Sequence, residues 1–194
     1  MTPEAEMNSA VPAAPAKSSK TIRNVAIAAG VAIALLLWVL ATSTPSSQEV
    51  NSPLVGKTAP ELIGTDADGK AFDLTDYRGS WVLVNFFASW CPPCQAEHPE
   101  LVKFAERHSS GDANVVSVAF NDTPEDIAAF FDKRGGDWPV LAEGTDPVVL
   151  NYGVVKLPES FLVAPDGTIV AKLIAGITAD VVDGLIAEYS GGAG

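Results

Sequence analysis

The apolar positions of this 194-residue chain form two regions with different patterns. Residues 24–41 (NVAIAAGVAIALLLWVLA) are almost entirely apolar, which predicts a helix that is apolar on every side. At about 1.5 Å per residue such a helix measures about 27 Å, close to the ~30 Å apolar core of a bilayer. We therefore expect a transmembrane helix at 24–41, with Trp38 near its outer end at the membrane interface.

Beyond residue 53 the apolar runs are short and alternate with amphipathic segments. This alternation, closed by a terminal hairpin, predicts an α/β fold with a mixed central sheet flanked by helices on both faces. The expected elements are an N-terminal β-hairpin within 61–74 turning at Asp68-Gly69, buried strands at 81–87 and 114–120, helices at 91–108 and 123–134, two strands within 159–174 around Pro165-Asp166-Gly167, and a last helix from about Thr178.

Composition sets the expected boundaries of the parts. Segments rich in Ala, Pro, Ser and Gly, without a periodic apolar pattern, are typical of tails and linkers. We expect a disordered tail at 1–23, the anchor at 24–41, a polar linker at 42–52, the folded domain at 53–189 and a flexible tail at 190–194.

The charges indicate how the chain is oriented. Lys17, Lys20 and Arg23 precede the apolar run and Glu49 is the first charge after it, so the positive-inside rule puts the N-terminus in the cytoplasm and the domain outside. A single-pass cell-membrane protein is the expected result. A cleaved signal peptide stays open, because residues 41–43 (ATS) resemble a cleavage site. Either way the domain is exported.

The net charge limits the partners. It is −12 for the whole chain and near −13 after residue 45, where 9 basic residues face 22 acidic ones. Phosphate backbones need clustered Lys and Arg, so no nucleic-acid partner is expected.

The only two cysteines, Cys91 and Cys94, enclose Pro92 and Pro93 at the predicted start of a helix. A helix N-terminus lowers the pKa of a thiol, and its first turn tolerates prolines, which also hold the two sulfurs close. As a structural disulfide the pair would stabilise little, because it closes so short a loop. We expect a redox-active disulfide and no other cofactor, with Cys91, beside an exposed Trp90, attacking and Cys94 resolving.

Metal binding is the alternative from a different functional class. Zinc usually takes four ligands, and the chain offers the two cysteines with His98 and His108. A copper-binding chaperone could use Cys91, Cys94 and His98. The helix placement of the cysteines is explained by redox chemistry and not by copper, so we expect no metal and interpret His98 as a surface residue of the helix.

The run VLVNFFASWCPPC (residues 82–94) resembles the thioredoxin superfamily. The N-terminal hairpin, the anchor and YGVVKLPESFLVAPDG (residues 152–167) make residues 53–189 similar to the membrane-anchored extracytoplasmic TlpA, ResA and CcmG (DsbE) group. The resemblance implies a thioredoxin-like thiol–disulfide oxidoreductase that reduces exported proteins such as apocytochrome c. A CcdA-like or DsbD-like membrane protein would supply the electrons.

A general oxidant or reductase of exported proteins, not tied to cytochromes, stays open. Lys156 and Ser160 stand where the CcmG pattern has Gly and Thr. The N-terminal half also resembles peroxiredoxins. Peroxidase chemistry needs a hydroxyl residue and a proline at the positions of Ala88 and Val84, so that activity is not expected.

The resemblance also implies roles for residues outside the cysteine motif. Pro158 would be cis and face the cysteines, leaving the backbone of Leu157 free to pair with a substrate peptide. Glu159, directly after this proline, would belong to the same substrate-binding segment.

A buried acid could exchange a proton with the resolving thiol. Thioredoxin has a buried Asp where this chain has Asn85, so Glu97 or Glu159 would have to supply the carboxylate. Glu97 lies three residues after Cys94, on the same helical face. An ordinary solvated Glu97 is the equal alternative.

Overall fold

The computed structural model describes residues 19–42 and 48–191. Residues 1–18 of the expected tail, residues 43–47 of the expected linker and residues 192–194 at the C-terminus lie outside the described residues. The chain divides after Thr44 into an N-terminal unit and a larger C-terminal unit.

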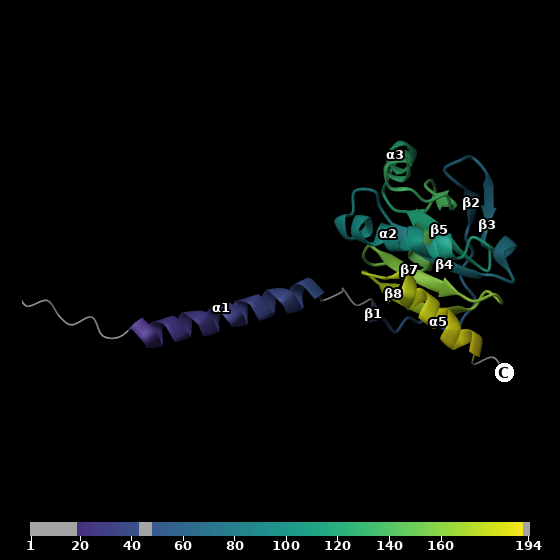
Figure 1. The fold of residues 1–194 in the computed structure, drawn as a ribbon. Coiled ribbons are helices and arrows are strands. Elements are labelled where there is room, and N and C mark those ends of the chain that lie inside the picture. Colours follow the sequence, from purple (N-terminus) through teal and green to yellow (C-terminus); the bar gives the residue numbers. More distant parts are fainter. Residues whose placement is uncertain (1–18, 43–47, 192–194) are drawn as a thin grey trace, which may run out of the picture. The chain divides into compact units, whose positions relative to one another are not determined.

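The N-terminal unit contains one described helix, α1 (Ser19–Thr42), which includes the apolar run (Figure 1). Its described large apolar side chains, among them Val25, Leu36 and Trp38, are exposed. Within the described residues no helix has the length and apolar character needed to cross a membrane. The anchor therefore stays a prediction.

The C-terminal unit is built on a six-stranded mixed sheet in the order β1-β8-β7-β4-β5-β6 (Figure 1). The parallel pairs are β4 with β5 and β5 with β6, and the pairs β4–β7, β7–β8 and β1–β8 are antiparallel. The strands are β1 (Gln48–Glu49), β4 (Trp81–Phe87), β5 (Ala113–Ala119), β6 (Val140–Leu141), β7 (Glu159–Val163) and β8 (Ile169–Ile174).

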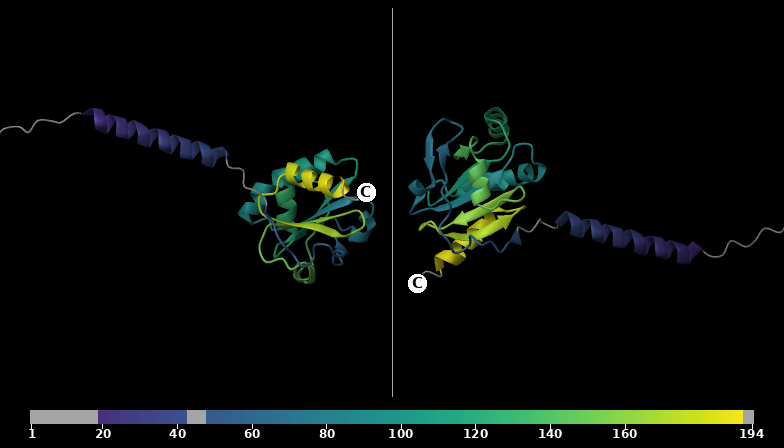
Figure 2. Two further views of the ribbon diagram at one scale, coloured as in Figure 1. Left: turned by 90° about the horizontal axis from the view of Figure 1, so that it is seen from below. Right: turned by 180° about the vertical axis from the view of Figure 1, so that it is seen from behind.

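Alternate side chains of β4 enter two hydrophobic cores, one on each face of the sheet. Leu83 and Phe87 belong to the core that also contains both cysteines, whereas Val84 and Phe86 belong to the other. Figure 2 shows helix α5 (Ala179–Gly191) and helix α2 (Pro92–Arg107) together on one face of the sheet. The cysteine-side core includes residues of α2, α3 (Pro124–Arg134) and α5; the opposite core includes residues of the β3 strand (Ala71–Asp73), the 3₁₀ helix η1 (Leu74–Tyr77) and α4 (Asp146–Asn151).

The expected hairpins, central strands and long helices are confirmed. The first hairpin pairs β2 (Ile63–Thr65) with β3, and Gly69 in its turn has a φ of 80°. Helix α3 begins as its sequence predicts: the Thr123 hydroxyl accepts the Asp126 N–H at 3.1 Å, and Pro124 follows the cap.

Some elements differ from the expectation. The two-residue β6 and six-residue α4 were not expected, because such short elements show no periodic pattern. β1 lies within the segment expected to be a linker, and pairs with β8. Helix α5 runs two residues beyond Tyr189, the expected end of the domain.

Candidate active site

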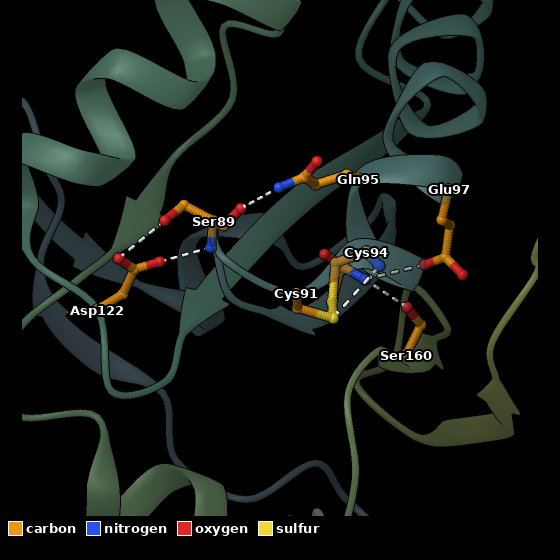
Figure 3. The surroundings of a disulfide bond; sticks show 8 residues. Ser89, Cys91, Cys94, Gln95, Glu97, Asp122 and Ser160 are labelled. Atoms are coloured by element: carbon orange, nitrogen blue, oxygen red, sulfur yellow. Dashed lines mark hydrogen bonds between the residues drawn. A yellow bond between two sulfur atoms is a disulfide. The ribbon is translucent and has the colours of Figure 1, made fainter.

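Cys91 and Cys94 form a disulfide at the N-terminus of α2, just beyond the carboxyl end of β4 (Figure 3). Cys91 is the N-cap residue, and its Sγ accepts the N–H of Cys94 at 3.3 Å. Pro92 and Pro93 occupy the first turn, where the helix has no N–H bonds to lose. The predicted placement of the pair at a helix start is confirmed, and this position favours a thiolate once the disulfide is reduced.

A hydrogen-bond network holds the segment that leads into Cys91 (Figure 3). Ser89 donates through its N–H and hydroxyl to the Asp122 carboxylate, at 2.5 and 3.0 Å. Gln95 donates to the Ser89 carbonyl at 2.7 Å, and Arg134 in turn donates to Gln95 Oε1 at 2.9 Å. Sequence reasoning missed this network. Asp122 follows β5, and β5 pairs in parallel with β4, so the carboxyl ends of the two strands lie side by side. The position of Asp122 directly after β5 was therefore the available signal in the sequence.

The residues expected to bind substrate include Trp90 and the Leu157–Pro158 pair. Trp90 is 56% exposed, and its indole N–H donates to the Asn121 carbonyl at 3.0 Å. The Leu157–Pro158 bond is cis, as the resemblance implied. Leu157 packs against the core that holds the cysteines. Within the described chain, the backbone N–H and C=O of Leu157 make no hydrogen bond.

Glu97 is buried, with 4% of its surface exposed, so it is not an ordinary solvated helix residue. Its Oε1 accepts from Asn85 Nδ2 at 3.3 Å and its Oε2 accepts from the Ile177 N–H at 3.2 Å. Burial raises the pKa of Glu97 to about 7, against the opposing effect of backbone hydrogen bonds from Ile177 and Gly176. The carboxyl group can therefore hold or release a proton near neutral pH.

Glu159 is fully buried, but on the other face of the sheet. Side chains alternate along β7, so Glu159 shares a face with Phe161 of the opposite core. Its Oε2 lies 2.7 Å from the Nζ of Lys172, which also donates to the Gly153 carbonyl at 3.2 Å. The Glu159 side chain does not reach the surface, so it does not supply the substrate contact expected from its position.

His98 corrects another expectation: it is 3% exposed and is not a surface residue. Its Nε2 lies 2.8 Å from the Gly135 carbonyl, and its ring packs on Phe130, Phe131 and Trp138. Burial lowers the pKa of His98. Across the described residues, no group of three or more His, Cys, Asp or Glu side chains is placed to hold a metal.

The CxxC disulfide at a helix start, the mixed sheet and the cis proline define a thioredoxin-like thiol–disulfide oxidoreductase. The chain belongs to the AhpC/TSA family, whose model matches residues 55–172. It is 30% identical over 136 residues to the thiol-disulfide oxidoreductase ResA of Bacillus thuringiensis (strain Al Hakam), covering 70% of this chain and 79% of the relative. The resemblance to the TlpA, ResA and CcmG group is thereby confirmed.

Solved structures agree with this assignment. The thioredoxin domain of a thiol-disulfide oxidoreductase from Bacteroides vulgatus has 27% identity and a TM-score of 0.63, covering 71% of this chain and 99% of that one. A secreted Mycobacterium tuberculosis disulfide oxidoreductase homologous to E. coli DsbE shares the fold, with 23% identity, a TM-score of 0.58, and coverage of 66% and 95%. The chain is thus an oxidoreductase of the ResA and DsbE type.

Proposed function

We propose that this chain reduces disulfide bonds of exported proteins outside the cytoplasm, with apocytochrome c as the leading substrate. The observation that carries the proposal is a CxxC pair at a helix start together with an unpaired backbone segment at the cis Leu157–Pro158 bond. Leu157 packs against the core that holds the cysteines and also against the opposite core, and its backbone makes no hydrogen bond to the described chain. The relatives named thiol-disulfide oxidoreductase ResA support this class of reaction.

The reaction proceeds by two thiol–disulfide exchanges. The Cys91 thiolate attacks one sulfur of the substrate disulfide, so that an intermolecular S–S bond forms and the other substrate sulfur leaves as a thiolate. Cys94 then loses its proton, attacks the Cys91 sulfur, closes the Cys91–Cys94 bond and releases the second substrate thiol. Two electrons pass to the substrate, and the oxidised enzyme needs a donor for the next cycle.

Several side chains would assist this reaction. Trp90, Pro92 and Pro93 are exposed around the disulfide and would contact the substrate peptide, whose backbone would pair with Leu157. Glu97 would accept the proton of Cys94 as that thiol attacks, since a carboxyl group with a pKa of about 7 exchanges protons readily at neutral pH.

The proposed location is the cell membrane, with the N-terminus in the cytoplasm. The apolar run 24–41 in the sequence and the basic residues that precede it support an uncleaved, single-pass signal anchor. A CcdA-like or DsbD-like membrane protein would then re-reduce Cys91–Cys94 from the membrane side.

A cysteine trap tests the proposal. With Cys94→Ala in the full-length chain, the first exchange can occur and the second cannot, so substrates stay covalently attached to Cys91. Apocytochromes c among the captured proteins would support the leading substrate. Capture of other exported proteins alone would favour the general reductase. Equal trapping by Cys91→Ala, in which Cys94 is the only thiol, would show that the assignment of Cys91 as the attacking residue is wrong.

A further inference from the structure

Asn85 connects three elements of the domain, β4, β7 and α2. It lies in the central strand β4 with 1% of its surface exposed. Its Nδ2 donates to the Ser160 hydroxyl of β7 at 3.0 Å and to Glu97 Oε1 of α2 at 3.3 Å. In the view of Figure 3, Glu97 and Ser160 lie on the opposite side of Cys94 from Asp122. An amide nitrogen has two N–H groups, and both are used here.

The Glu97 carboxylate is held from two sides. Asn85 binds one oxygen, and the backbone N–H of Ile177 binds the other. Among the described residues, the groups that hydrogen-bond to this carboxylate are uncharged: the Asn85 amide and the backbone at Gly176 and Ile177.

Several charged side chains of α2 and α5 have partners other than Glu97. Glu100 accepts the Ala179 N–H at 2.9 Å and pairs with Lys103. Arg107 pairs with Asp180 and Asp183. The Glu97 carboxylate is therefore held by neutral hydrogen-bond donors. Among the described residues, Asn85 supplies the only side-chain donor.

We infer that Asn85 is a positioning residue for the exchange reaction: its amide fixes the Glu97 carboxylate in the orientation in which it acts on Cys94. The inference rests on the proposed proton transfer between Glu97 and Cys94. An amide suits this position because it donates without titrating. A carboxylate in its place would set a like charge within hydrogen-bond distance of Glu97 and oppose its ionisation.

The test measures how strongly Glu97 and Cys94 are coupled. The thiolate absorbance of Cys94 is followed as a function of pH in four versions of the full-length chain, all of which carry Cys91→Ala. These versions combine Glu97 or Glu97→Gln with Asn85 or Asn85→Leu. An ionised Glu97 raises the pKa of the Cys94 thiol. Glu97→Gln should therefore lower the pKa of Cys94 by about one pH unit when Asn85 is present. When Asn85→Leu is also present we expect less than half of that shift, because the carboxylate is no longer held.

The choice of variants separates positioning from general disturbance. Asn85→Leu preserves the approximate side-chain volume, and Asn85→Ala takes its place in the test if the Asn85→Leu variant does not fold. Ser160→Ala removes the other partner of Asn85 but keeps the Asn85–Glu97 bond, so we expect it to retain the full shift.

The outcomes distinguish the possible failures. An equal Cys94 shift with Asn85 and with Asn85→Leu overturns the inference and leaves the role of Glu97 intact. No shift in either background removes the role of Glu97, and the inference with it. The proposed reductase function is assessed separately, by the trap and by turnover of protein disulfides in the unmodified chain.

Discussion

The imidazole of His98 donates from Nε2 to the carbonyl oxygen of Gly135 at 2.8 Å. The carbonyl can only accept, so Nε2 must carry the proton. His98 lies one helical turn after Cys94, and Gly135 is the C-cap of α3. This bond therefore joins the helix that carries the disulfide to the end of the neighbouring helix.

Replacing His98 is expected to destabilise the domain without abolishing its chemistry. His98→Ala leaves a cavity among Phe130, Phe131 and Trp138 and an unpaired Gly135 carbonyl, so we expect a loss of about 2–4 kcal/mol. His98→Phe keeps the ring volume and should lose about 1–2 kcal/mol. Urea unfolding measures both.

The same variants test the copper alternative. Under conditions in which it stays folded, His98→Ala should still turn over protein disulfides. A loss of stoichiometric copper binding in the variant, with binding present in the parent chain, would instead favour the chaperone.

Glu97 makes stability depend on pH in a direction unusual for a carboxylate. Its pKa is raised from 4.5 to about 7 on folding, so between these values the folded chain holds the proton more tightly than the unfolded chain. The parent therefore loses stability as the pH rises through this window, by up to ~3 kcal/mol.

Glu97→Gln removes that loss. In this variant one hydrogen of the new side-chain amide points at a backbone or side-chain hydrogen-bond donor, which lowers the free energy of unfolding by ~1 kcal/mol. We expect the oxidised variant to be about 1–2 kcal/mol more stable than the parent at pH 8, and no more stable at pH 5. Urea unfolding at both values checks this. A difference between the two proteins that does not vary with pH would show that Glu97 titrates normally.

The buried Lys172–Glu159 pair should tolerate removal of both charges better than removal of one. Lys172→Met leaves the fully buried Glu159 carboxylate without its cation, and we expect a loss of about 3 kcal/mol at pH 7. Lys172→Met with Glu159→Gln should recover most of it. Chemical unfolding of the single and double variants decides, and a double variant as unstable as the single one would contradict the prediction.

Trp90 is expected to contribute more to the reduction of protein disulfides than to the reduction of small disulfides. Its ring is largely exposed and its orientation is set by the bond to Asn121, so it offers apolar area to a docked peptide. Trp90→Ala should lower kcat/KM for a protein disulfide about tenfold, equivalent to ~1.4 kcal/mol. Reduction of a small disulfide such as oxidised glutathione serves as the control. An equal loss on both substrates would indicate a disturbed disulfide instead.

Local sequence determined the main elements of the domain and the place of its chemistry. The apolar run 81–87 became the buried β4 because β-forming side chains on both faces can only be satisfied in the centre of a sheet. The proline pair and the Thr123 cap set the starts of α2 and α3, since these preferences act within one turn. Short elements such as α4 carry too little pattern to be recognised in this way.

Tertiary structure decided what the polar residues do. The sequence left open whether Glu97 or Glu159 supplies a buried carboxylate, but the alternation of β7 directs Glu159 to Lys172, while Asn85 and Ile177 bind Glu97 on the cysteine side. His98 became a core residue because α3 and Trp138 cover its helix face. Burial, and with it the pKa of a carboxyl or imidazole group, depends on which distant segments pack over it, and no local pattern contains that information.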